Sequence, residues 1–309
     1  MDVTVAIDAK GQADVGIDSG LADSAAGGRN VWRDEARDWS GPEVRLMPQI
    51  SLQNVTKEFV SGARRTLAVS DFSLDVDKGS FISLVGPSGC GKSTVLSMIG
   101  GLAAPSSGRI VIDGQVVTGA NEKIGTVFQE AHLLPWRNVF GNIMFPVELR
   151  KHHRREYEPR ARELLQITGL SRFAEHYPHE LSGGMRQRVA ICRALILNPE
   201  ILLMDEPFSA LDAMTREEMT YELQRIWSST GKTVVFVTHS VREAVFLSDR
   251  IAVMGLNPGR LIHNVKVELD RPRTAAMETQ TDFNRIVEEI RGAIGQGHNS
   301  AENPPIERK

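Results

Sequence analysis

Two kinds of hydrophobic spacing meet near residue 86, and the change from one to the other is the clearest structural signal in the chain. Residues 81–85 form an almost continuous apolar run, which is typical of a short buried strand. Further along, apolar side chains return at the spacing of one helix face: Val95, Leu96, Met98, Ile99 and Leu102. The pattern therefore predicts a strand, a short loop and then a helix.

The surrounding pattern predicts two kinds of sheet. Strict alternation at Phe72, Leu74 and Val76 favours half-buried antiparallel strands. Residues 201–204 and 234–237 are instead continuously apolar, as in strands buried on both faces of a parallel sheet. Because helix-spaced segments separate these runs, we expect an α/β fold with a doubly wound, mostly parallel core sheet and an antiparallel β subdomain.

Within the predicted α/β core at residues 50–268, one stretch lacks strand signals. From about residue 130 to 182 apolar side chains recur only at helical spacing, and Pro159 suits a first helical turn. We interpret this stretch as an inserted helical subdomain.

The two ends of the chain have a different composition. Residues 1–49 are polar and rich in Gly, Ala, Ser and Asp, so we expect a mostly disordered N-terminal tail. Residues 269–309 are expected to form a C-terminal extension with one short helix at roughly 282–294 and a disordered end from 295.

Composition excludes several classes of function. The 309 residues carry a formal net charge of −3, which does not favour a nucleic-acid partner. The sequence has no apolar run long enough to cross a bilayer and no signal segment, and its two cysteines show no metal-ligand spacing. We therefore expect a cytosolic protein.

The loop between the predicted strand and helix fits the pattern G-x-x-x-x-G-K-[ST]. Its glycines allow backbone N–H groups to converge on an anion, and the helix N-terminus adds partial positive charge. Lys92 supplies a point charge, and the Ser93 hydroxyl is placed to hold Mg²⁺ between terminal phosphates. The predicted nucleotide-binding residues are Gly86, Pro87, Ser88, Gly89, Cys90, Gly91, Lys92, Ser93 and Thr94.

Polar side chains follow the predicted strands at the sheet edge where such folds bind ligands. We assign Asp205 to the hydration shell of the metal and Glu206 to the general base. His239 follows the next strand, where its imidazole can bond the γ-phosphate and orient the base. Gln129 also ends a predicted strand and can sense the metal or the attacking water.

A second glycine motif, at residues 181–188, opens another predicted helix and forms a second anion site. One triphosphate does not need two such sites in one chain. The economical arrangement is a two-fold homodimer, in which the second motif of each chain covers the nucleotide of the other.

With these motifs in order, the chain resembles the nucleotide-binding subunit of an ATP-binding cassette (ABC) transporter, over about residues 50–254. The resemblance implies a P-loop NTPase fold with ATP and Mg²⁺ as ligands. It also implies that Phe59 stacks on adenine and that the D-loop ends at Asp212. The signature residues that it places on the partner's nucleotide are Ser182, Gly183, Gly184 and Gln187.

The segment after Gln129 resembles that of ATPases serving nitrate, sulfonate, taurine and related importers, and so does the C-terminal extension. In that group a helix of the membrane permease docks beside the Q-loop, here near Leu134, Pro135 and Trp136. The resemblance implies a peripheral location on the cytoplasmic side of the membrane, with a solute-binding protein acting indirectly.

Two alternatives to an importer are open at this point. One is an exporter or a lipoprotein-release ATPase, and the other is a soluble ABC ATPase that acts as an assembly switch. ABC ATPases that act on nucleic acid or ribosomes resemble tandem cassettes or carry a long coiled-coil insertion. This chain has one cassette and no heptad run there.

Overall fold

The computed structural model describes residues 5–7, 13–15, 47–62 and 64–302, and the chain divides into two units between residues 45 and 46. In the first unit, β1 (Val5–Ile7) and β2 (Ala13–Val15) form an antiparallel pair. The tail predicted for residues 1–49 otherwise falls mostly outside the described residues.

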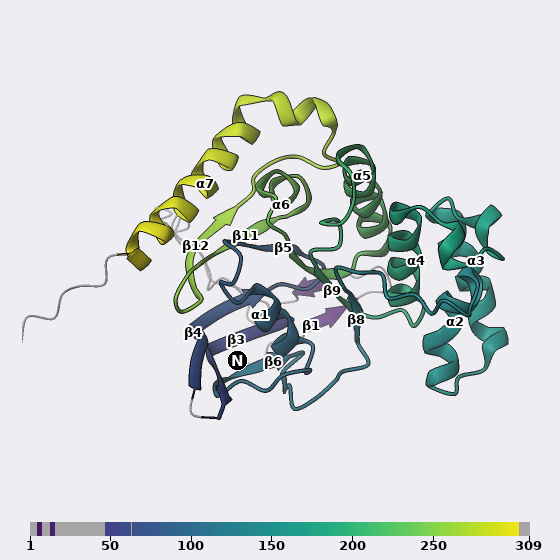
Figure 1. The fold of residues 1–309 in the computed structure, drawn as a ribbon, viewed down its shortest axis with the longest axis horizontal. Helices are drawn as coiled ribbons and strands as arrows, with labels where there is room; N and C mark the ends of the chain where they lie inside the picture. Colours follow the sequence, from purple (N-terminus) through teal and green to yellow (C-terminus); the bar gives the residue numbers. More distant parts are fainter. Residues whose placement is uncertain (1–4, 8–12, 16–46, 63, 303–309) are drawn as a thin grey trace, which may run out of the picture. The chain divides into compact units, whose positions relative to one another are not determined.

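The second unit is built on a six-stranded sheet (Figure 1). The strand order is β12 (Arg260–Lys266), β11 (Arg250–Gly255), β5 (Phe81–Val85), β10 (Thr233–Val237), β9 (Ile201–Asp205) and β8 (Ile124–Val127). All neighbouring pairs are parallel except β11 with β12. The predicted core sheet is thus confirmed, and β5 lies near its centre with both faces covered.

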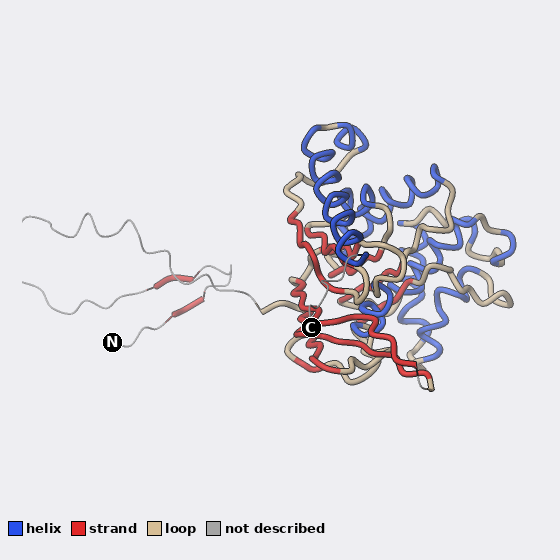
Figure 2. Tube along the Cα trace, turned by 60° about the vertical axis from the view of Figure 1, so that its left-hand side comes forward, coloured by secondary structure: helices blue, strands red, loops and turns tan. Residues whose placement is uncertain are grey.

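A second, antiparallel sheet packs beside the first and confirms the alternating pattern. Its order is β4 (Arg64–Val76), β3 (Ile50–Ser61), β6 (Ser107–Ile112) and β7 (Gln115–Val116). The buried positions Phe72, Leu74 and Val76 of β4 lie opposite apolar residues of β3. Figure 2 shows the strands of both sheets in red and the helices that cover them in blue.

Helices cover both faces of the larger sheet because β5 is apolar on both sides. Ile82 and Leu84 join a core with α1 (Lys92–Ile99) and the antiparallel sheet, whereas Phe81 and Val85 face the opposite core. That second core contains α5 (Ala213–Thr230), α6 (Val241–Leu247) and α7 (Thr281–Glu302). This is the doubly wound arrangement expected from the alternating pattern.

Between β8 and β9 the chain is helical, and these helices gather at one end of the sheet (Figure 1). The elements are α2 (Val139–Leu149), α3 (Arg154–Ile167), the 3₁₀ turns Ser171–Phe173 and Pro178–Glu180, and α4 (Gly183–Leu195). The predicted start at Pro159 is wrong, because α3 already begins at Arg154. Five residues that are compatible with a helix precede the proline in α3. Because proline has no N–H, it removes one intrahelical hydrogen bond, and this bond lies near the start of the helix.

Two other sequence predictions at helix ends are wrong. Leu102 does not continue α1, which ends at Ile99, and its side chain is 63% exposed. The final helix α7 runs to Glu302 rather than ending near 294. Ile290 is buried and Ile294 packs against the core, and this packing outweighs the cost of three glycines in the helix.

The C-terminal extension packs against the second core through α7, and the 3₁₀ turn at Ala275–Thr279 accepts hydrogen bonds from Arg242 of α6 through Glu278. None of the helices in the described parts of the chain is long and apolar enough to cross a bilayer.

Candidate active site

A glycine-rich loop joins β5 to α1, and two positions in this loop accept only glycine. Gly86 and Gly91 have positive φ angles of 156° and 92°. A Cβ atom at Gly86 would lie 2.5 Å from the Met254 carbonyl oxygen, and one at Gly91 would lie 2.9 Å from Cγ2 of Val69. The loop is therefore held between β11 and β4, which fixes its backbone at the start of α1.

The first two residues of α1 present the side chains expected of a phosphate site. Lys92 is buried, and its ammonium donates hydrogen bonds to the carbonyls of Gly86 at 2.9 Å and Pro87 at 3.0 Å. Ser93 is exposed, and its hydroxyl donates to Oδ1 of Asp205 at 3.0 Å. A positive charge and a hydroxyl are thus held together at a helix N-terminus, where anions bind.

The remaining residues of the loop differ in exposure. The predicted members not yet placed are Ser88, Gly89, Cys90 and Thr94, of which Cys90 alone is buried. Its burial raises the pKa of the Cys90 thiol, although the charge of Lys92 opposes the shift. Cys90 is therefore an unreactive small residue that packs beneath the loop.

At the same edge of the sheet, a carboxylate faces an imidazole. Glu206 directly follows β9, and its Oε2 lies 3.3 Å from Nδ1 of His239, which follows β10. Glu206 has a φ angle of 43°, unusual for a residue with a side chain, and its N–H donates to the Val237 carbonyl at 2.9 Å. The backbone therefore holds this carboxylate in one direction, in a geometry suited to a general base oriented by histidine.

Asp205 lies beside this pair in a partly buried environment. Burial raises the pKa of the Asp205 carboxyl, and the nearby Glu206 charge adds to the shift. The hydrogen bond from Ser93 and the charge of Lys92 act in the opposite direction. Since its ionised form has lost part of its hydration, this carboxylate is suited to a cation ligand, and Ser93 supplies a second oxygen donor.

Phe59 and Gln129 are both accessible. Phe59 lies near the end of β3 with 48% of its surface exposed, and Nζ of Lys57 is 5.1 Å from its ring centroid. An exposed ring of this kind offers a face on which a base can stack. Gln129 is exposed two residues after β8, so the strand ends before it rather than on it as predicted.

The second glycine motif caps α4. The Ser182 hydroxyl accepts a hydrogen bond from the Met185 N–H at 3.3 Å and is exposed, with Gly183 next to it. A Cβ atom at Gly184 would lie 2.5 Å from Cγ2 of Thr215, so glycine is needed where α4 meets the start of α5. Among the described residues, no hydrogen bond or ion pair joins this motif to residues 86–94.

Two predicted nucleotide contacts have partners within the chain. Gln187 is buried and donates to the Phe128 carbonyl at 3.2 Å, so its side chain links α4 to the segment before Gln129. Asp212 caps α5 by accepting from the Thr215 N–H at 3.0 Å, and this bond lowers the pKa of the Asp212 carboxyl. Their predicted contacts with nucleotide stay predictions.

One residue that supports the phosphate loop has no signal in the sequence. Gly259 lies in the turn between β11 and β12, where it exchanges backbone hydrogen bonds with Ala68 at 3.0 Å and Ser70 at 2.8 Å. A Cβ atom there would lie 2.0 Å from the Cys90 carbonyl oxygen. A glycine in a turn is common, so the local sequence does not mark Gly259 as special. The residue that it contacts, Cys90, lies more than 160 residues earlier in the chain.

Gly259→Ala is expected to weaken nucleotide binding, because the added methyl group must displace the phosphate loop. Overpacking of this kind costs about 1–3 kcal/mol, which corresponds to roughly 5- to 150-fold in affinity. Titration with a fluorescent ATP analogue measures the effect. Gly292→Ala is the control, since a Cβ atom there meets nothing within 4 Å. Wild-type affinity in Gly259→Ala would contradict the proposed support.

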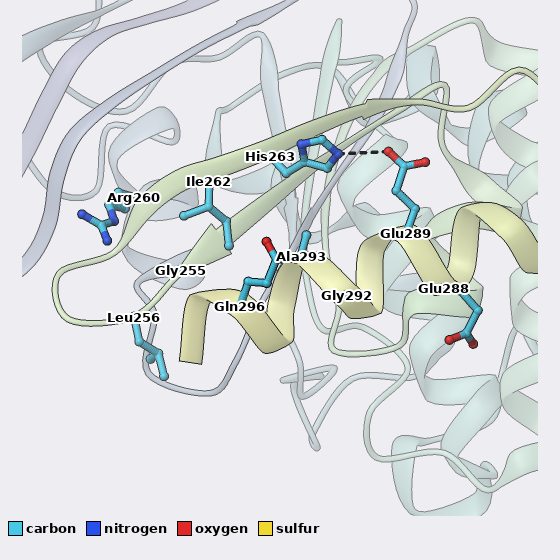
Figure 3. Close-up of a pocket in the computed structure, with 10 residues that line it drawn as sticks. All are labelled: Gly255, Leu256, Arg260, Ile262, His263, Glu288, Glu289, Gly292, Ala293 and Gln296. Atoms are coloured by element: carbon cyan, nitrogen blue, oxygen red, sulfur yellow. Dashed lines mark hydrogen bonds and ion pairs between the residues drawn. The ribbon is translucent and has the colours of Figure 1, made fainter. Parts of the chain in front are cut away.

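A cavity of about 560 Å³ lies away from these residues, between the β11–β12 hairpin and α7 (Figure 3). Nε2 of His263 on β12 lies 3.0 Å from Oε1 of Glu289 on α7, across this space. None of the predicted site residues lines it. The chemistry identified above is therefore at the carboxyl edge of the sheet and not in this cavity.

Comparison with known proteins agrees with this geometry. A family model described as ABC transporter matches residues 69–209. The chain is 44% identical over 238 residues to the taurine import ATP-binding protein TauB of Rhizobium johnstonii, covering 75% of this chain and 90% of that protein. It is 39% identical over 238 residues to the aliphatic sulfonates import ATP-binding protein SsuB of Bacillus cereus, covering 77% and 94% respectively.

Solved structures give the same fold. A dimeric ATP-binding cassette in a post-hydrolysis state, bound to ADP and Pi, matches with a TM-score of 0.62 and 36% identity. The match covers 72% of this chain and 100% of that one.

Proposed function

The chain belongs to the ABC transporter family, in its group of import ATPases, and from that membership we propose that it powers the uptake of a small anion such as nitrate, a sulfonate or taurine. The chemistry is ATP hydrolysis. One structural observation carries this function: the phosphate loop, the Ser93–Asp205 pair and the Glu206–His239 pair lie together at the carboxyl edge of one sheet.

In the proposed reaction, each group acts on a different part of ATP. The loop backbone and Lys92 bind the β- and γ-phosphates, and the exposed ring of Phe59 stacks on adenine. Glu206 accepts a proton from the water that attacks the γ-phosphate, while His239 orients this carboxylate and donates to the phosphate. Gln129 is exposed and lies two residues after β8, a strand of the same sheet. In this proposal it contacts the attacking water.

The residues present fit a magnesium ion. Mg²⁺ usually takes one or two protein oxygen ligands and fills the rest of its shell with water and substrate phosphate. Ser93 and Asp205 supply such a pair, and no cluster of three or more metal-ligating side chains occurs in the described ranges. We therefore assign Ser93, Asp205 and Gln129 to Mg²⁺, which would neutralise charge on the phosphates.

A homodimer is proposed because Ser182, at the start of the second glycine motif, is exposed, and no hydrogen bond or ion pair joins the motif to the phosphate loop within the described part of the chain. In a head-to-tail pair, Ser182, Gly183 and Gly184 would meet the nucleotide of the partner, as Asp212 would from the D-loop. The matched cassette bound to ADP and Pi is itself dimeric, which supports this arrangement.

A groove of about 370 Å³ beside Gln129 is the proposed docking site of a permease helix. Apolar side chains of Phe128, Leu134, Phe145 and Leu149 line it. Pro135 and Trp136 follow on the surface, and Trp136 is 71% exposed, which is unusual for so large an apolar side chain. Docking here would hold the chain against the cytoplasmic side of the membrane, with a solute-binding protein acting only through the permease.

The test of transport function is to tag the chain, solubilise native membranes gently and identify the proteins that co-purify. A multi-spanning permease is expected, and its own sequence would narrow the choice of solute. Recovery of an active ATPase only from the soluble fraction, without a permease, would overturn the importer proposal and leave the ATPase assignment intact.

Trp136→Ala is expected to reduce the recovered permease strongly, because large aromatic side chains dominate such interfaces. Loss of one aromatic anchor costs about 2 kcal/mol or more, which is roughly 30-fold in affinity. ATP hydrolysis by the purified chain should change little. Leu102→Ala is the control, because Leu102 is also an exposed apolar residue, at 63%, but lies outside the proposed docking segment Leu134–Trp136. Equal recovery from both variants would remove Trp136 from the interface.

A further inference from the structure

Arg216 of α5 holds the loop that follows the general base. Its guanidinium donates to three carbonyls of residues 206–212: Phe208 at 3.3 Å, Ser209 at 3.5 Å and Leu211 at 2.9 Å. Ser209 in turn bonds the Glu206 carbonyl, from its N–H at 3.2 Å and its hydroxyl at 3.0 Å. The Arg216 side chain therefore holds the backbone of residues 206–212 at three carbonyls.

Glu243 of α6 holds the turn that carries His239. Its Oε2 accepts a hydrogen bond from the Thr238 hydroxyl at 2.7 Å, and that hydroxyl accepts one from the Ser240 N–H at 2.9 Å. Thr238 is buried, with both bonding directions of its hydroxyl used. The residues on either side of His239 are thus fixed by one carboxylate.

The two side chains meet each other. Nε of Arg216 lies 3.8 Å from Oε1 of Glu243, whose side chain is only 11% exposed. Burial raises the pKa of the Glu243 carboxyl, while the bond from Thr238 and the charge of Arg216 oppose the shift. Since Glu206 and His239 are themselves 3.3 Å apart, the contacts form a closed ring through both loops.

We infer that Arg216 and Glu243 are positioning residues for ATP hydrolysis, which hold the loop after Glu206 and the turn carrying His239 in one fixed relation. The inference rests on the proposed function, because it assigns these contacts to the Glu206–His239 pair. Neither side chain is expected to touch ATP. Their role is to set the distance between a base and the imidazole that orients it.

The ring also gives a route between the two nucleotide sites of the proposed dimer. The loop that Arg216 fastens ends at Asp212, which lies on the surface that would face the partner chain. A shift of that loop would move Arg216 and, through Glu243, the turn that carries His239. Closure of the dimer would then complete the geometry of the base within each chain.

The test compares kcat and KM for ATP in purified full-length variants. Glu243→Ala should lower kcat by about 10- to 100-fold, with KM within about threefold, since a misplaced base slows the chemical step without removing phosphate contacts. Glu243→Gln keeps an acceptor for Thr238 and should lose less. Thr238→Val should resemble Glu243→Ala, whereas Thr238→Ser restores the hydroxyl and should be close to wild type. Glu217→Ala is the control, because Glu217 lies next to Arg216 on α5 and its carboxylate accepts a hydrogen bond from Tyr221 instead.

A double-mutant cycle separates this role from general weakening of the fold. Because Arg216 and Glu243 act through one connection, the pair Arg216→Ala and Glu243→Ala should be within about twofold of the worse single variant. Multiplied losses in the double variant, or wild-type kcat in folded Glu243→Ala and Thr238→Val, would overturn the inference. A wild-type chain that hydrolyses no ATP would instead count against the proposed function itself.

Discussion

Glu206→Gln should abolish turnover while leaving ATP binding intact. The amide keeps the shape of the side chain but cannot accept the proton of the attacking water, and loss of a general base costs about 10²- to 10⁴-fold in rate. Lys92, Ser93 and Asp205 are unchanged, so the phosphate site keeps its contacts. ATP bound but not hydrolysed should then hold two chains together, and size-exclusion chromatography with ATP and Mg²⁺ should show a dimer.

Glu200→Gln is the control for this variant. Glu200 lies just before β9, at the opposite end of the strand that leads to Glu206, and its carboxylate pairs with exposed lysines. Its loss should leave kcat close to wild type, because surface ion pairs contribute little. A Glu206→Gln variant that turns over at the wild-type rate would remove Glu206 from the role of base, whatever happens to dimerisation.

The central part of the fold could be predicted because its signals are local. The strand at 81–85, the glycine loop and the helix after it are each encoded by residues adjacent in sequence. The edge that gathers Asp205, Glu206 and His239 also follows from local patterns, since the carboxyl ends of parallel strands meet at one edge. The partners within this edge, Ser93 with Asp205 and Glu206 with His239, are what the structure adds.

Helix ends were less predictable because tertiary contacts decide them. Pro159 is a local signal for a helix start and the glycines of α7 are signals for a helix end, yet all of them lie inside helices. In α7 the packing of Ile290 and Ile294 on the core compensates for weak local propensity. No single-sequence pattern reports such packing.

The contacts that support the site were invisible for the same reason. Gly259 touches the phosphate loop, and Arg216 and Glu243 join two loops, across separations of 27 to more than 160 residues. Gln187 resembles a nucleotide ligand by its place in a motif, but its side chain is buried against Phe128. Motif spacing identifies chemistry at a surface and does not show which way each side chain points.

Arg273 is expected to be the most important residue of the C-terminal extension for stability. It is 2% exposed, and Nη1 donates to the carbonyls at the end of α6: Val245 at 2.8 Å, Phe246 at 3.1 Å and Ser248 at 2.7 Å. Burial lowers the pKa of its guanidinium to about 10, so it remains charged at neutral pH. The positive charge thus lies at the negative end of the helix that begins just after His239.

Arg273→Ala should lower the free energy of unfolding by about 3–5 kcal/mol, since it leaves three buried carbonyls without a donor and opens a cavity. Chemical denaturation followed by tryptophan fluorescence measures the change. Arg291→Ala is the control: its side chain is 57% exposed and pairs with Glu288, so its loss should cost less than about 1 kcal/mol. Because Arg273 fastens α6 from the end opposite His239, residual folded Arg273→Ala should also hydrolyse ATP more slowly than Arg291→Ala. Equal stability of the two variants would mean that the α6 carbonyls find other donors, and that the extension is not needed to hold the histidine turn in place.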